Sequence, residues 1–434
     1  MRKNVNKLVA LAIGISIISG SIIPAFAADT TQQVSVTTTG AQIANGKPLL
    51  TLDDAIKAAI SNSETLALDD KKISYQDKTN DINEELDDYN NVSGDKEDFN
   101  DDTRDINLKK LKQQRDFDED VLRQKVITKY NSIVTSQMKI NKSAKALELK
   151  NKDLSDAKFK ENLGMITSTS FKSTELDIKN LQITQKASES ALQNAKDSFK
   201  VLTGIDVDKY SLEQDIPYET LKIDGSIDEY LDDVINKYVE YSEQLIKLNK
   251  DYYNDKDNKV NASIVSDAKT ITDTAKANGE PKFTDSKYDI ALYSNYNEAY
   301  KAYKDDHDKY ESEINAYANA ISARLTYLST KLSIDQNQTS LNESKKQFKE
   351  QLKTFYTNLI TQEETINYLN QSIELNNKKL SDAKLKYDLG MITESAYNTQ
   401  VVSSRDLDLQ LRDGIDTYNT LKEKIQKPWI AFSN

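Results

Sequence analysis

One pentapeptide occurs twice in this chain, as Leu163-Gly164-Met165-Ile166-Thr167 and as Leu389-Gly390-Met391-Ile392-Thr393. A glycine at this place lets an incoming helix end in the left-handed conformation, and the threonine three residues later can cap the helix that follows. The repeat therefore predicts two helical hairpins that turn at the same sequence. The apolar residues of each turn either close the end of a coiled coil or form an exposed contact patch.

The similarity extends well beyond the two turns. With a shift of 226 residues (389 − 163), residues 148–152 and 154–158 align with residues 374–378 and 380–384, with only one change, Lys150 to Asn376. Further upstream, Tyr130 aligns with Tyr356 and Ile140 with Ile366. Matches at one fixed spacing indicate an internal duplication, so the chain is predicted to contain two copies of one structural unit.

The segments that lead into the turns carry a heptad pattern. Neither Gly nor Pro occurs between residues 282 and 389, which favours a very long helix. Apolar residues recur every seventh position, at Leu352, Leu359, Ile366, Ile373, Leu380 and Tyr387 in the second copy and at Val126, Ile133, Ile140, Leu147 and Leu154 in the first. This spacing is typical of coiled coils. The predicted fold is all-α, with two tandem repeats of a long antiparallel coiled-coil hairpin.

The ends of the chain suggest an exported protein. Arg2, Lys3 and Lys7 precede an apolar stretch that ends in Ala25-Phe26-Ala27, which predicts a signal peptide over residues 1–27, with a membrane anchor as the alternative. We expect a flexible leader at 28–47, hairpin repeat 1 at 48–222, hairpin repeat 2 at 223–427 with an insert at about 254–303, and a C-terminal tail at 428–434. The tail holds the only Trp, Trp429, and either folds back onto the helices or anchors to an envelope surface.

Composition excludes several classes of function. The net charge is −12, and without the three cations of residues 1–27 it is −15 (−12 − 3), which argues against nucleic-acid binding. The absence of Cys rules out thiol catalysis, and a single histidine, His307, rules out a multi-histidine metal site. No phosphate loop or dinucleotide motif is present. We therefore predict neither an enzyme nor a cofactor.

One helical stripe is unusually aromatic. Its residues recur at alternating spacings of three and four, at Tyr293, Tyr296, Tyr300, Tyr303, His307, Tyr310, Ile314, Tyr317 and Ile321. The stripe is either a coiled-coil seam built from tyrosine or a half-wet aromatic wall that lines a passage or grips a sugar polymer.

The duplicated long hairpins, the two turns and the opening Thr51-Leu52-Asp53-Asp54-Ala55-Ile56 together resemble the TolC-like outer-membrane efflux protein family. The resemblance covers roughly residues 48–427. It implies a homotrimer, a location in the outer membrane, and tips that contact a periplasmic adaptor protein of an inner-membrane transporter. On that basis Gly164, Met165, Ile166, Thr167, Gly390, Met391, Ile392 and Thr393 are the predicted adaptor contacts.

The family also places strands of an outer-membrane barrel inside each repeat, and here the chain departs from the family pattern. Residues 84–105 contain ten acidic and two basic residues, so we predict that these strands are missing or reduced. The same run is either a solvated loop capping a hairpin or a calcium site, and it lacks ordered calcium-loop spacing.

Two functions follow from these observations. The first is a subunit of an efflux or export conduit. The second is an exported coiled-coil scaffold or surface interaction protein that forms no pore and remains at the cell surface or outside the cell.

Overall fold

The computed structural model describes residues 43–44 and 46–432. The expected signal peptide and most of the expected leader lie outside these residues. The helices are α1 (Leu52–Ser61), α2 (Glu64–Tyr89), α3 (Asp95–Asn162), α4 (Ser168–Thr203), α5 (Ile227–Asn254), α6 (Ala262–Asn278), α7 (Tyr296–Asp388), α8 (Glu394–Gln426) and α9 (Trp429–Phe432), with short 3₁₀ helices η1 (Val207–Lys209), η2 (Ser286–Tyr288) and η3 (Ile290–Leu292). The predicted all-α fold class is confirmed.

The strands of the described residues form one small sheet. The strand β2 (Lys47–Leu50) pairs antiparallel with β1 (Ile43–Ala44) and parallel with β3 (Ser211–Leu212). The parallel register places Leu49 opposite Ser211. The sheet thus attaches the start of the first repeat to the segment that follows α4. Among the described residues, no helix is both long and apolar enough to cross a bilayer.

The chain divides into two compact units. Of the described residues, unit 1 contains those up to 79, those from 110 to 239 and those from 345 onward, and unit 2 contains residues 80–109 and 240–344. Because α2, α3, α5 and α7 run through both units, each unit holds parts of both expected repeats. The expected repeat boundaries at 222 and 427 remain a prediction.

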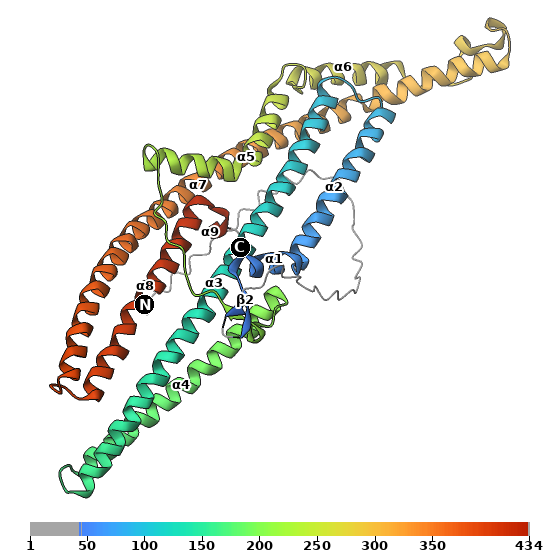
Figure 1. Ribbon diagram of the computed structural model, residues 1–434. Helices are drawn as coiled ribbons and strands as arrows, with labels where there is room; N and C mark the ends of the chain where they lie inside the picture. The colour runs from blue at the N-terminus through green and yellow to red at the C-terminus, as the bar shows by residue number, and fades with distance from the viewer. Residues whose placement is uncertain (1–42, 45, 433–434) are drawn as a thin grey trace. The chain divides into compact units, whose positions relative to one another are not determined.

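Unit 1 contains the two hairpins. The helix α3 turns into α4 and α7 turns into α8, and each pair runs antiparallel (Figure 1). The heptad positions Val126, Ile133, Leu352, Leu359 and Ile366 are almost fully buried. The heptad positions nearer the turns are only half buried. The predicted seams therefore form, and they pack most tightly at the ends away from the turns.

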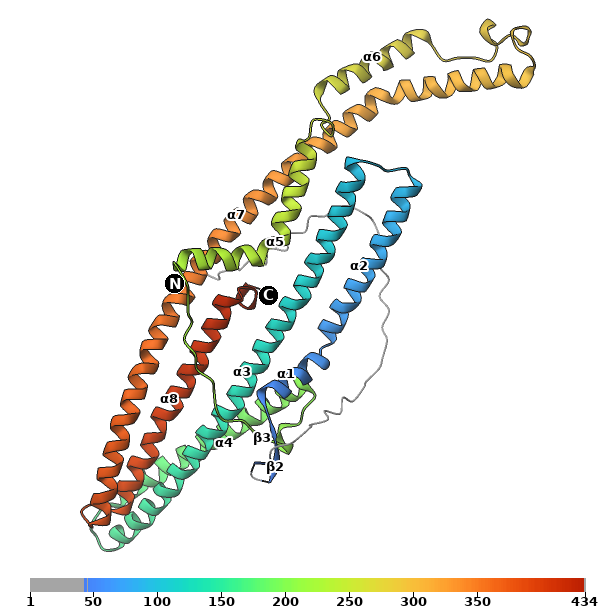
Figure 2. The same ribbon diagram turned by 45° about the horizontal axis from the view of Figure 1, so that its top comes forward.

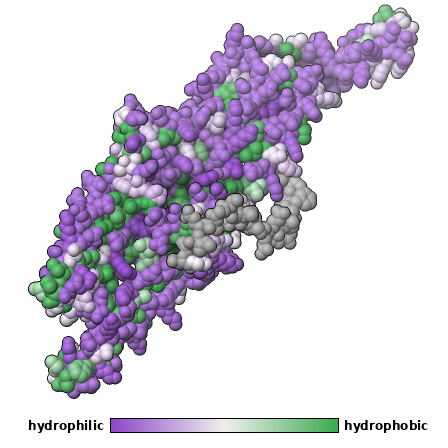
Figure 3. Space-filling model, in the orientation of Figure 1, coloured by the Kyte–Doolittle hydropathy of each residue, from purple (hydrophilic) through white to green (hydrophobic). Residues whose placement is uncertain are grey.

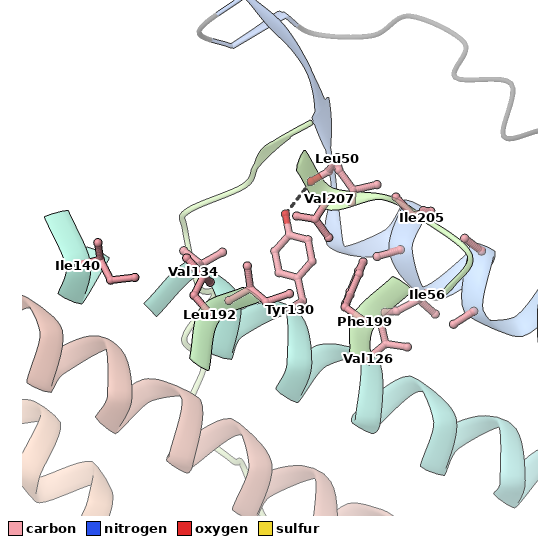
Figure 4. Packing of buried hydrophobic residues seen from close by; sticks show 14 residues of the cluster. Leu50, Ile56, Val126, Tyr130, Val134, Ile140, Leu192, Phe199, Ile205 and Val207 are labelled. Atoms are coloured by element: carbon pink, nitrogen blue, oxygen red, sulfur yellow. Dashed lines mark hydrogen bonds between the residues drawn. The ribbon is translucent and has the colours of Figure 1, made fainter. Parts of the chain in front are cut away.

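The first hairpin has a core that joins it to the start of the repeat. Val126 and Phe199 pack against Ile56 of α1 and Val207 of η1 (Figure 4). At the centre, the hydroxyl of Tyr130 donates to the carbonyl oxygen of Leu50 at 2.6 Å and accepts from the backbone N–H of Glu213 at 2.7 Å. Burial raises the pKa of Tyr130 to about 12. This side chain ties α3 to both segments of the small sheet region.

The second hairpin has an equivalent core, to which the C-terminal tail contributes. Leu352 and Tyr418 pack with Leu231 of α5 and with Phe432 of α9. Trp429 stacks on Phe117 with ring centres 4.2 Å apart, and its Nε1 donates to Asp120 at 3.0 Å. The tail folds back onto the helices, which confirms the first of the two interpretations of Trp429.

Unit 2 contains the acidic run, where the expected loop that caps a hairpin is present but much shorter than the run. Only residues 90–94 of the run 84–105 lie outside α2 and α3. Acidic residues in the first turn of α3 interact favourably with the helix dipole. Arg104 donates to Asp87 at 2.7 Å, and this hydrogen bond lowers the pKa of Asp87. The favourable interaction with the helix dipole and one partly buried ion pair thus let this acidic segment fold as a helical hairpin.

Candidate functional site at the hairpin tips

The two turns share one backbone conformation. Gly164 and Gly390 have φ angles of 71° and 72°. In the first turn the N–H of Met165 donates to the carbonyl of Lys160 at 2.8 Å, and in the second the N–H of Met391 donates to that of Lys386 at 2.8 Å. This pattern is a Schellman motif, which needs a left-handed residue where glycine stands. The predicted role of both glycines in ending the helices is therefore observed.

The threonine of each turn starts the next helix. Thr167 Oγ1 accepts from the backbone N–H of Ser170 at 3.2 Å, and Thr393 Oγ1 accepts from that of Ala396 at 3.1 Å. An N-cap of this kind stabilises a helix by about 1 kcal/mol. Each five-residue turn is thus closed by its own sequence and presents its remaining side chains outward.

The apolar side chains at the tips divide into two kinds. Ile166 and Ile392 are half buried and help to close the ends of the coiled coils. Leu163, Met165, Leu389 and Met391 are exposed. Apolar surface lies at the ends of both hairpins (Figure 3). Both interpretations of the turn sequence therefore apply, each to different residues: the isoleucines close the coiled coil, and the leucines and methionines form an exposed patch.

Two further residues extend the exposed surface, and sequence analysis did not identify them. Phe159 and Leu385 are exposed four residues before Leu163 and Leu389, and they occupy equivalent positions under the 226-residue shift. They stand outside the heptad seam positions. The sequence did contain a signal for them: an apolar residue stands at the same position of both repeats although that position does not belong to the heptad seam.

The two tips differ in one aromatic contact. In the second hairpin, Tyr387 of α7 stacks on Tyr397 of α8 with ring centres 5.5 Å apart and planes inclined by 7°. Lys384 lies over both rings. The equivalent positions in the first hairpin are Glu161 and Phe171. A stacked pair of aromatic rings therefore joins the two helices of the second tip, and the first tip lacks this pair.

Contacts between α3 and α8 bring the two hairpins together near their tips. Ser395 donates to Asp153 at 2.8 Å, and Lys152 lies 3.6 Å from Glu394. Farther from the tips, Lys142 pairs with Asp406, and Lys139 with Asp413 at 2.9 Å. All of these residues belong to unit 1. The predicted tip residues of both copies thus lie at the same end of one unit (Figure 1).

The aromatic stripe forms a separate cluster inside unit 2. The ring of Phe283 lies 5.4 to 5.6 Å from the rings of Tyr296, Tyr300 and Tyr303. Tyr293 precedes α7, so the helix does not carry the whole predicted stripe. Tyr310 and Tyr317 are half buried on α7, and His307 lies 3.3 Å from Glu280. Tyr303 packs as a seam residue would, whereas Tyr296 and Tyr300 are exposed.

No group of three or more His, Asp or Glu residues that could hold a metal ion occurs within 43–44 and 46–432. In the run 84–105, Asp95, Glu97 and Asp98 lie in the first turn of α3, and Asp87 and Asp101 pair with Arg104. The tip site offers apolar surface, two rigid turns and a few charges, a chemistry that suits binding of another protein.

Comparison with solved structures agrees with this architecture. The outer-membrane channel OprN aligns with a TM-score of 0.52 at 10% sequence identity, over 87% of this chain and 90% of that chain. The chain has a TolC-like fold. Looser alignments reach CmeC, an outer-membrane channel of Campylobacter jejuni (TM-score 0.49, 12% identity, 94% of this chain and 93% of that chain), and VceC, an outer-membrane protein of Vibrio cholerae (0.48, 10%, 87% and 96%).

No family model and no curated protein matches the sequence. The resemblance drawn from the two turns is confirmed as a resemblance of fold.

Proposed function

We propose that this chain is one subunit of a TolC-like conduit that carries material across the cell envelope by efflux or export. The matched apolar tips carry the proposal, because a long helical hairpin with a rigid, exposed, apolar end is suited to end-on contact with another protein. In this proposal residues 1–27 direct the chain out of the cytoplasm and the mature chain works in the outer envelope. Cargo passes through the assembly without bond chemistry.

A conduit needs several copies of the chain. The duplication suggests how the copies contact one another, because equivalent faces of the two repeats differ in burial. On α3, Leu149 lies on the same face as Lys142 and Asp153, which contact α8, and it is 5% exposed. Its equivalent on α7, Leu375, is 55% exposed. One repeat is thus covered by its neighbour within the chain, while the matching face of the other repeat is open.

The partner side of this contact shows the same difference. Val402 and Leu409 are buried on the face of α8 that meets α3, whereas their equivalents on α4, Leu176 and Ile183, are exposed. A second copy that places α4 against α7 would repeat the contact between α8 and α3. Because these two surfaces differ, the contact is head to tail, and contacts of this kind form a ring when the rotation between copies closes. We assign the ring three copies, as the family resemblance implies.

In the assembled ring the tips would meet a periplasmic adaptor protein of an inner-membrane transporter. The contact residues would be those of the two turns, together with Phe159 and Leu385. Apolar side chains in a small desolvated patch commonly provide most of the binding energy at such interfaces.

The mass and conductance of the mature chain test the conduit. We expect a trimer in detergent solution and discrete conductance after insertion into liposomes. A monomer without conductance would contradict the conduit and favour the coiled-coil scaffold.

Tip variants test the adaptor contact separately. The double substitution Met165→Ser and Met391→Ser should abolish capture of the adaptor by the chain, with no change in the trimer or in helical content by circular dichroism. Ile271→Ser is the matched control, because it removes an exposed apolar residue of α6 that lies away from the tips and outside the proposed contacts between copies. Normal capture by the tip variant would exclude this site.

A further inference from the structure

An apolar stripe runs along the outer face of α2 in unit 2. Ile82, Leu86 and Tyr89 are all exposed, and their spacings of four and three place them on one face of the helix. Apolar residues repeated on one exposed helix face indicate a partner rather than scattered surface residues.

This face of α2 points away from its neighbour within the chain. Asn80 donates to the carbonyl oxygen of Arg104 at 3.4 Å, and Asp87 accepts from Asn100 and Arg104, so these two residues mark the face that meets α3. Ile82 and Tyr89 each follow one of them by two residues. At 3.6 residues per turn that separation is about 200° around the helix, so the stripe lies on the opposite side.

A second stripe lies on α7 of the same unit. Leu325, Leu328 and Leu332 are exposed at spacings of three and four. Tyr327 and Lys331 show which face of α7 meets α5: the hydroxyl of Tyr327 donates to the carbonyl oxygen of Tyr253 at 3.1 Å, and Lys331 donates to Asn254. The leucines therefore stand beside the α5 contact and are not covered by it.

Comparison of the two repeats shows that the second stripe lacks a covering helix. Under the 226-residue shift, Leu325 is equivalent to Phe99 of α3. Phe99 stacks on Tyr252 of α5 with ring centres 4.1 Å apart and is 8% exposed, whereas Leu325 is 64% exposed. The α3 position is covered by a helix from the other repeat, and the equivalent α7 position has no such cover within the chain.

The two stripes occupy opposite edges of unit 2. Contacts join α2 to α3, α3 to α5 and α5 to α7, so the order of these helices is α2, α3, α5, α7 (Figure 2). The stripe on α2 and the stripe on α7 cannot meet within one copy. They can meet between copies that associate head to tail.

The charges beside the stripes are complementary. Residues 81–89 of α2 contain five acidic residues and no basic one. Residues 321–334 of α7 contain two basic residues, Arg324 and Lys331, and no acidic one. Arg324 donates to the backbone carbonyl oxygen of Val260, and Lys331 donates to the side-chain oxygen of Asn254, so both cations bind neutral oxygens. Opposite charges across a contact set its register and exclude wrong pairings.

We propose that unit 2 forms a second seam between copies of this chain, in which Ile82, Leu86 and Tyr89 of one copy pack against Leu325, Leu328 and Leu332 of the next. The occupant of both stripes is thus a second copy of the chain. This inference rests on the proposed function in one respect, namely that several copies of the chain associate. The seam adds a contact in unit 2 to the contacts between copies that we propose in unit 1.

Cysteine cross-linking tests the seam directly, because the chain has no cysteine of its own. The double variant Ile82→Cys with Leu328→Cys should form a ladder of covalent oligomers under mild oxidation, which thiol reduction reverses. Each single variant should remain uncross-linked, because a head-to-tail contact brings different residues together. The matched control is Ile82→Cys with Thr326→Cys, whose second position is exposed on another face of α7.

The outcomes separate this proposal from the conduit. An assembled, conducting chain without the expected cross-link would overturn the seam and leave the conduit intact. A cross-linked ladder without conductance would support the seam and remove the conduit. Covalent dimers from either single variant would show a two-fold contact and would also overturn the seam. Circular dichroism on each variant verifies that the exposed substitutions leave the helices intact.

Discussion

The interior of each hairpin is apolar, whereas the seam between the hairpins adds polar and charged pairs to a few buried apolar residues. Inside the second hairpin, Leu352, Ile366 and Tyr418 are almost fully buried. Between the hairpins, α3 and α8 meet through Asn131 and Asp416 at 2.6 Å, and through Arg412 and Thr135 at 3.1 Å. Apolar burial does not depend on the charge state of side chains, whereas contacts between charged groups depend on pH and are screened by salt. The hairpins should therefore persist under conditions that loosen their seam.

The largest effect should come from the interior. Leu352→Ala removes a side chain that has no solvent exposure, so the free energy of unfolding should fall by about 2–5 kcal/mol. Leu375→Ala is the matched control on the same helix, and the change should be within about 0.5 kcal/mol for the isolated chain. Urea denaturation followed by circular dichroism measures both. Equal losses for the two variants would contradict the proposed difference in burial.

A smaller loss is expected when the polar seam loses its buried cation. Arg412 also donates through Nη1 to the carbonyl oxygen of Gln214, so Arg412→Leu leaves that carbonyl and the Asp416 carboxylate without their nearby cation. We expect a loss of about 1–3 kcal/mol. Arg412→Lys keeps the charge but cannot reproduce the planar guanidinium contacts. Its stability should therefore lie between that of the wild type and that of Arg412→Leu. A fully stable Leu variant would show that the cation does not stabilise the seam.

The pH dependence of the seam should be visible through Asp416. Burial raises the pKa of this carboxyl in the folded protein. The folded chain therefore holds the proton more tightly than the unfolded chain, and this stabilisation is complete below the unfolded value of about 3.9 and is lost as pH rises through the raised folded value. The stability of Asp416→Asn relative to the wild type should accordingly increase from pH 4 to pH 7.

Denaturation at several pH values measures this difference, and Asp408→Asn controls for the removal of one charge from α8. Parallel stability curves for the wild type and Asp416→Asn would contradict the assignment.

The smallest effect should come from the exposed ion pairs. Lys139 and Asp413 lie 2.9 Å apart with both side chains about half exposed, so their coupling energy should be at most about 1 kcal/mol and should fall in 1 M NaCl. A double-mutant cycle with Lys139→Met and Asp413→Asn measures it. A coupling that high salt leaves unchanged would point to a buried contact instead.

Much of the tip could be predicted from sequence because its structure is local. The left-handed glycines and the threonine caps involve residues within six positions of one another, so the turn sequence contains their causes. Phe159 and Leu385 escaped prediction because helix periodicity alone does not show which non-seam apolar residues a neighbouring helix will cover. The ring pair of Tyr387 and Tyr397 escaped it because it depends on how two helices align across a turn.

The acidic run 84–105 shows a second reason why sequence alone did not predict the structure. Its composition pointed to a loop, but Arg104 lies seventeen residues from Asp87 and reaches it only when α2 and α3 fold together. A pairing of this kind depends on the tertiary position of two helices, and charge composition does not report it.

The sequence by itself determined the duplication, the heptad seams, the turns and the all-α fold, because each depends on short periodicities or on capping between near neighbours. Only the tertiary structure decided which copy of each repeated face is covered. Leu149 and Leu375 occupy the same place in their repeats, yet the first is buried and the second is open. The physical reason is that burial depends on which helix arrives from far along the chain, and one chain can cover only one of two equivalent faces.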